Sequence, residues 1–166
     1  GLGDVYKRQV HHRHKPRRRR RRVRFARRRL AARPVSRHAD PNLAVRRFEA
    51  ADAVPLTELL HEAYAELGAR GLNFTAVDQC AQTTLARSLA GQCWVVVRRE
   101  EIVGSLTMSL PPSRGLQELT PAAREDGRAW LNQVAVSPRL RGRGIAADLW
   151  RRGRRWAAAQ LSLIHI

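Results

Sequence analysis

The fold is decided by the stretch Leu131-Asn132-Gln133-Val134-Ala135-Val136-Ser137-Pro138-Arg139-Leu140-Arg141-Gly142-Arg143-Gly144-Ile145-Ala146. Its first part is apolar and β-branched, as strands are, and the run 145–156 has the spacing of a helix. Between them, Gly142 and Gly144 let the backbone turn sharply. The first amides of a helix have no intrahelical acceptor and lie at the positive end of its dipole. The stretch therefore predicts an anion site suited to a phosphate or pyrophosphate.

This glycine turn differs from two common phosphate-binding motifs. A P-loop ends in Gly-Lys-Ser/Thr, and the dinucleotide fingerprint has three glycines and a later acidic residue, so neither fits. A strand-to-helix turn without any ligand stays open as the plain alternative. The stretch resembles the acetyl-CoA signature of the GNAT superfamily of N-acyltransferases, Q/R-x-x-G-x-G/A after a hydrophobic strand. Arg139, Gly142 and Gly144 occupy its defined positions, and Ala146 stands where many members have a third glycine.

The resemblance extends from about Leu43 to Gln160 and implies where a coenzyme lies. It implies that the backbone of 134–136 pairs with the pantetheine arm and that the amides of 141–146 hold the pyrophosphate. The side chains of Arg141 and Arg143 are expected to add charge to the phosphates. The expected coenzyme-binding residues are Val134, Ala135, Val136, Arg139, Arg141, Gly142, Arg143, Gly144, Ile145 and Ala146. Acetyl-CoA is the expected co-substrate, and no metal is expected.

The resemblance also implies an amine acceptor beside the first two helices, which is a small molecule or a peptide. The expected acceptor contacts are Tyr64, Asn73 and Phe74, although a core aromatic and a helix cap explain the same region. No catalytic residue is assigned. The candidates for a general base are Glu118, Glu125, Asp126 and His61, all of which are equally explained as surface groups. Gln133 can position a water but cannot take a proton.

Positive charge is distributed unevenly along the chain. Of 32 Lys and Arg residues, 16 lie in residues 1–40, where only Asp4 and Asp40 oppose them, so this segment carries +14 of the net +18. Such a segment repels itself and has little apolar surface to bury. We expect a disordered, non-native segment at 1–40 and a non-native tail at 161–166, because both ends resemble translated sequencing-adapter sequence. A basic arm that binds nucleic acid through phosphates is the alternative.

Residues 41–160 are expected to form a partial domain of the α/β class, an α+β arrangement with a mixed sheet. The resemblance makes this a GNAT-like acyl-CoA N-acyltransferase fold, incomplete at the C-terminus and therefore inactive as this fragment. The expected order is strand, helix, helix, strand, strand, strand, helix. In detail, we expect a strand at 43–48, a helix capped by Asp52, a second helix capped by Thr75, strands at 93–97 and 102–110, and a polar loop at 113–127. The strand 102–110 is expected to have one apolar face.

The remaining composition narrows the class of protein. Cys80 and Cys93 belong to no metal-spaced cluster and are expected to be buried thiols in a reducing, cytoplasmic compartment. No apolar run is long enough for a membrane span. The four tryptophans are expected in the core. The sequence thus favours an acetyl-CoA-dependent N-acetyltransferase, with a nucleic-acid-binding protein or a non-catalytic CoA sensor as alternatives; its oligomeric state stays open.

Overall fold

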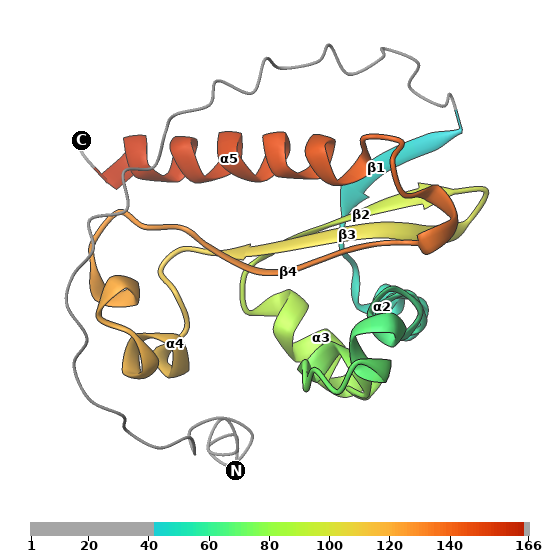
Figure 1. Cartoon of the computed structure of the whole chain (residues 1–166). Helices are drawn as coiled ribbons and strands as arrows, with labels where there is room; N and C mark the ends of the chain where they lie inside the picture. The colour runs from blue at the N-terminus through green and yellow to red at the C-terminus, as the bar shows by residue number, and fades with distance from the viewer. Residues whose placement is uncertain (1–41, 165–166) are drawn as a thin grey trace, which may run out of the picture. The chain divides into compact units, whose positions relative to one another are not determined.

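The computed structural model describes residues 42–164, with side chains up to residue 161, so the basic segment expected at 1–40 lies outside the described residues (Figure 1). The strands are β1 (Leu43–Arg47), β2 (Gln92–Arg98), β3 (Glu101–Ser109) and β4 (Trp130–Val136). The helices are α2 (Ala53–Ala69), α3 (Ala81–Leu89), α4 (Arg114–Leu119) and α5 (Ile145–Ile164). Short 3-10 turns lie at η1 (Ala50–Asp52), η2 (Thr75–Val77), η3 (Pro121–Arg124) and η4 (Pro138–Leu140). The predicted class and order are confirmed, with α4 added.

The four strands form one sheet in the order β1-β2-β3-β4, and every neighbouring pair is antiparallel. Helices α2 and α3 cover one face and α5 covers the other, as Figure 1 shows. On the α2 face, Leu56 and Leu60 of the helix pack against Val95. On the α5 face, Leu149 packs with Leu106 and Val96. The core therefore lies in two layers on either side of the sheet.

A bulge changes the expected pattern of β3. Val96 pairs with Gly104 while Val97 pairs with Ile102, so Val103 is an extra residue in β3. Ile102 consequently packs on the α2 face, and Leu106 and Met108 on the α5 face. The expectation of a single apolar face over 102–110 is wrong, because helices cover both faces of the sheet. The polar side chains of the second face are also buried: Ser105, Thr107 and Ser109.

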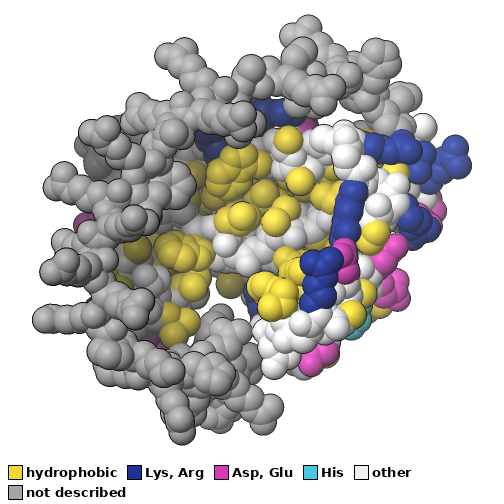
Figure 2. All heavy atoms as spheres, in the orientation of Figure 1, with side chains coloured by type: hydrophobic (Ala, Val, Ile, Leu, Met, Phe, Trp, Pro, Cys, Tyr) yellow, Lys and Arg dark blue, Asp and Glu magenta, His cyan; other side chains and the backbone are white. Residues whose placement is uncertain are grey.

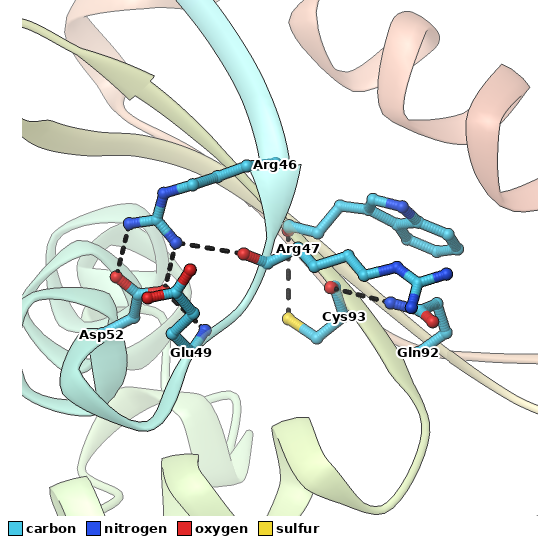
Figure 3. A network of polar contacts seen from close by, with 7 residues as sticks. Arg46, Arg47, Glu49, Asp52, Gln92 and Cys93 are labelled. Carbon is cyan, nitrogen blue, oxygen red and sulfur yellow. Dashed lines mark hydrogen bonds and ion pairs between the residues drawn. The ribbon is translucent and has the colours of Figure 1, made fainter.

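Asp52 has a different role from the one expected (Figure 3). Its carboxylate accepts two hydrogen bonds of 2.7 Å from the Arg46 guanidinium and one of 2.8 Å from the Glu49 N–H. It therefore closes η1 in a capping box with Glu49 and makes no side-chain cap to α2. The prediction that Asp52 caps the helix is wrong because the carboxylate is used by a charged partner on β1.

Several expectations about the second helix and the surface are also corrected. The helix begins at Ala81, not near Thr75, because the backbone leaves the helical region at Asp78 after η2 has placed Ala76 in the core. Leu89 is 63% exposed, and Ser88 is buried in its place.

Three further side-chain and loop expectations change in the same way. Of the two thiols, Cys93 is buried and Cys80 is exposed. Trp150 is 42% exposed, because it lies on the outward side of α5. The expected loop at 113–127 contains α4, which is capped by the Ser113 hydroxyl.

Candidate active site

The turn between β4 and α5 depends on two glycines. Gly142 has φ +78° and Gly144 has φ +81°, a backbone region that L side chains rarely adopt. A Cβ atom at Gly142 would meet no heavy atom within 4 Å. The positive φ therefore favours glycine at position 142. Crowding does not, because the surrounding atoms leave room for a side chain. This is the sharp turn that the spacing of the two glycines predicts.

The turn leaves a row of amides without acceptors. The first hydrogen bond of the helical ladder runs from the Asp148 N–H to the Gly144 carbonyl, at 3.0 Å. Within residues 42–164, no amide N–H from 142 to 147 donates to another group. A hollow of about 360 Å³ opens beside these amides. It is lined by Val136, Leu140, Arg141, Gly142, Gly144, Ile145, Ala146 and Ala147.

The outer edge of β4 continues this surface. Among the described strands β4 is the last of the sheet, with β3 on one side only. The Ser137 N–H donates to the Val103 carbonyl at 2.9 Å, so Ser137 faces the β3 side. Because alternate residues of an antiparallel strand face the same neighbour, Ala135 also pairs with β3. The N–H and C=O groups of Val134 and Val136 therefore point to the open edge.

Tyr64 on α2 reaches this edge. Its hydroxyl donates to the Val134 carbonyl at 3.0 Å, and its ring meets Phe74 edge-to-face at 5.9 Å. Burial raises the pKa of the half-buried Tyr64 hydroxyl, against smaller opposing effects of the Val134 hydrogen bond and the Arg87 charge. Phe74 and Asn73 are exposed. Of the three expected acceptor residues, the structure thus brings Tyr64 and Phe74 together beside β4.

The arginines of the turn lie against α2 instead of pointing at the row of amides. Arg139 Nε lies 3.4 Å from Glu62 Oε1, and Arg141 Nη1 lies 3.5 Å from Glu66 Oε2. Arg141 also donates to the Ala63 carbonyl at 3.1 Å. Figure 2 shows basic and acidic side chains mixed on the side of the molecule that carries this turn. Arg143 is exposed and makes no ion pair with any described residue.

Substituting Glu66 tests whether this ion pair competes with a phosphate. We expect Glu66→Gln to tighten the binding of inorganic pyrophosphate about two- to fivefold, because an exposed ion pair contributes only up to about 1 kcal/mol and its loss frees Arg141. Isothermal titration of pyrophosphate measures this effect, with Glu58→Gln on the exposed side of the same helix as the control. Weaker binding by Glu66→Gln would instead show that Glu66 holds Arg141 in place for the phosphates.

The candidate bases are not gathered at this edge. Glu118 lies on α4, Asp126 is exposed, and Glu125 pairs with Arg128. His61 Nε2 lies 2.9 Å from the Gln79 carbonyl. Among the described residues, none of these candidates has a hydrogen bond or ion pair to β4 or to the glycine turn. Sequence reasoning missed Glu62 and Glu66, whose only signal is their i, i+4 spacing on one side of α2.

The open edge of β4 thus leads into a glycine turn whose amides lack acceptors among the described residues, within a fold of the α/β class. The family described as "Acetyltransferase (GNAT) family" matches residues 55–166, and the chain belongs to that family. No curated protein matches the chain. No helix in the described part of the chain is long and apolar enough to cross a membrane.

Solved structures share the fold. A GNAT family acetyltransferase from Brucella melitensis, in complex with acetyl-CoA, is 19% identical with a TM-score of 0.53, over 71% of this chain and 70% of that one. An N-acetyltransferase from Staphylococcus aureus Mu50 is 19% identical with a TM-score of 0.52, over 72% and 68%. PaiA N-acetyltransferase from Thermoplasma acidophilum, in complex with coenzyme A, is 12% identical with a TM-score of 0.51, over 71% and 73%. At these identities the likeness shows the fold.

Proposed function

We propose that this chain binds acetyl-CoA and transfers its acetyl group to an amine. The observation that carries the proposal is the row of unpaired amides from 142 to 147, which continues into the open edge of β4. Membership of the acetyltransferase family and the coenzymes bound by the Brucella and Thermoplasma proteins support the same conclusion. Acetyl-CoA supplies the acetyl group as an activated thioester.

The residues present fit such a coenzyme. The amides of Gly142 to Ala147 lack acceptors, and phosphate oxygens are strong acceptors that a helix N-terminus favours. The positive φ of Gly142 and Gly144 turns the backbone at this point, and no neighbouring atom fills the space above Gly142. We therefore assign the diphosphate to these amides, and we keep the coenzyme-binding role for the residues expected from the sequence, which are Val134, Ala135, Val136, Arg139, Arg141, Gly142, Arg143, Gly144, Ile145 and Ala146.

The edge of β4 has the groups that the transfer needs. The Val136 N–H and C=O can pair with the amide groups of a pantetheine arm, as a neighbouring strand would. The Val134 N–H can donate to a carbonyl oxygen that gains negative charge during the transfer. The Tyr64 hydroxyl also lies beside Val134, because it donates to the carbonyl of that residue. We assign the acceptor to the α2 side of this edge, beside Tyr64, Asn73 and Phe74.

Two related ligands test the coenzyme site. CoA contains the nucleotide diphosphate, and pantetheine contains only the arm that would lie along β4. We expect pantetheine to bind at least about tenfold more weakly than CoA, because it loses charge-assisted hydrogen bonds of about 1.5–3 kcal/mol each. Isothermal titration of both ligands measures the difference. Equal affinities would show that the glycine turn does not hold the diphosphate.

A further inference from the structure

Arg87, in the last turn of α3, is a cation without a partner among the described residues. The residue is half-buried, and its side chain makes no hydrogen bond or ion pair within the described part of the chain. The arginines of the glycine turn differ, because Arg139 and Arg141 each lie beside a carboxylate of α2. Burying part of a charge is costly unless another group compensates it. The Arg87 guanidinium is therefore available to an anionic group from outside the chain.

The packing of α3 against α2 fixes where Arg87 lies. The Thr57 hydroxyl of α2 donates to the Thr84 hydroxyl at 2.6 Å, and the Gln79 side chain donates to the same hydroxyl at 2.7 Å. Thr84 and Ser88 are buried. Because residues three and four apart are neighbours on a helix surface, Arg87 starts beside this buried side of α3. Its guanidinium thus extends from a helix that is held in place.

The charge of Arg87 acts on the hydroxyl that reaches the edge of β4. Burial raises the pKa of the Tyr64 hydroxyl, and the hydrogen bond to Val134 and the positive charge of Arg87 oppose that rise. A charge alters the pKa of another group chiefly when the two lie close together. The same hydroxyl donates to the Val134 carbonyl at 3.0 Å. Arg87 is thus a cation beside the part of β4 where the acceptor is proposed to bind.

The surroundings of Tyr64 combine this cation with exposed apolar groups. Phe74, whose ring centroid lies 5.9 Å from that of Tyr64, is 48% exposed, and Leu72 is 46% exposed. A guanidinium is a planar fork that binds both oxygens of a carboxylate at once. It repels a second cation, so an amine without an anionic group gains nothing from it. The surface therefore suits an acceptor that has a carboxylate and an apolar side chain.

We propose that Arg87 binds a carboxylate of the acceptor, so that the acceptor is an amine that also has a carboxylate group, as an apolar amino acid does. The inference rests on the proposed acetyl transfer and names its substrate class. Arg87 acts here as a specificity-determining residue. The structural alternative is an arginine whose stem packs on the protein while its charged head stays in water.

The test uses two probes of the same size that differ in charge. Phenylalanine has a carboxylate where phenylalaninamide has a neutral carboxamide. Each is titrated by NMR into the full chain, with and without CoA, at a pH where both amines are protonated. We expect phenylalanine to bind about five- to tenfold more tightly, because a bidentate arginine–carboxylate pair is strong for an ion pair and the exposure of Arg87 limits its gain. Equal binding, including no detectable binding of either probe, would overturn the proposal.

Arg87→Gln assigns the preference to this side chain, because glutamine removes the charge and keeps a high helix propensity. We expect the preference for phenylalanine to fall to within about twofold while Tm stays close to that of wild type, because Arg87 has no described partner to lose. A preference that survives would show that another group binds the carboxylate. If this variant does not fold, Arg87→Lys keeps the charge and loses the fork, so it should reduce the preference about two- to threefold. An unchanged preference in Arg87→Lys would also contradict the bidentate contact.

Arg154→Gln is the matched control. Arg154 is exposed on α5, which covers the other face of the sheet, and it also lacks a partner among the described residues. We expect this variant to keep the preference for phenylalanine. Loss of the preference in both variants would point to a general attraction of anions and would contradict a specific role of Arg87. A wild type that distinguishes the probes but does not bind CoA would count against the proposed function only, and CoA binding without the preference would count against Arg87 only.

Discussion

Gly142→Trp is expected to weaken CoA binding at least about a hundredfold. The substitution places an indole over the amides of the turn, and the loss of two charge-assisted hydrogen bonds of about 1.5 kcal/mol or more each corresponds to this factor. Nothing lies within 4 Å of a Cβ at Gly142, so the side chain fits without displacing the core. Its φ of +78° makes any non-glycine residue strained there, at a cost of about 1–2 kcal/mol. Calorimetric titration of CoA measures the change.

Gly71→Trp controls for that strain. Gly71 has φ +74°, and a Cβ there also meets nothing within 4 Å, but it follows α2 and lies outside the turn between β4 and α5. Both variants should therefore lose similar stability in thermal unfolding, while only Gly142→Trp loses CoA. Retained binding by Gly142→Trp, or equal loss in both variants, would contradict the assignment of the diphosphate to this turn.

Asp52→Asn is expected to destabilise the fold by about 2–3 kcal/mol at pH 7. Removing one partner of a buried ion pair costs about 3–5 kcal/mol, and the lower figure applies because Arg46 is 41% exposed and regains water. The Asp52 side chain is itself only 9% exposed. An asparagine also cannot accept both Arg46 hydrogen bonds together with that of the Glu49 N–H. Urea unfolding measures the loss.

The pH dependence of this stability has a definite sign. The hydrogen bond from Arg46 is the main cause that lowers the pKa of Asp52, and burial opposes it. The folded-state pKa therefore lies below the value of about 3.9 in the unfolded chain. The stabilisation is complete at a pH above the pKa that Asp52 has in the unfolded chain. It is lost as the pH falls through the pKa that Asp52 has in the folded protein. Wild type should lose this stability below about pH 4, and Asp52→Asn should lack that part of the loss.

Asp126→Asn, at an exposed position, should behave like wild type at both pH 7 and low pH. If Asp52→Asn had wild-type stability at pH 7, or the same dependence on acid as wild type, the Arg46 contact would not be the source of the stabilisation. The comparison separates the Asp52 carboxylate from the general protonation of surface acids, which both variants share.

The sequence predicted the elements well where a pattern of several residues was regular. The strands expected at 93–97 and 102–110 and the strand before the glycine turn lie within a residue or so of β2, β3 and β4. The predictions failed where a single residue changed the alternation of a strand or the start of a helix. The bulge at Val103 moved Ile102 to the other face, and no alternation of apolar residues reveals an inserted residue. The break at Asp78 likewise depends on the burial of Ala76 under α2, a tertiary contact.

The candidate site also has a part that the sequence predicts and a part that it does not. Its backbone part was predictable, because glycines at 142 and 144 indicate a conformation that only glycine adopts readily. The side-chain part was not, since the Tyr64–Val134 and Arg141–Glu66 contacts join residues 70 and 75 positions apart. Local spacing has no information about such pairs. The coenzyme-binding assignments stay predictions that the Gly142 and pantetheine experiments address.

The open edge of β4 has a consequence for the behaviour of the protein in solution. Exposed strand edges with unpaired N–H and C=O groups are templates for pairing with another chain. Within the described residues only the Tyr64 hydroxyl covers part of this edge, at the Val134 carbonyl. A ligand that pairs with Val134 and Val136 would also shield the sheet from edge-to-edge aggregation. Purification in the presence of CoA is then a way to keep the protein monodisperse.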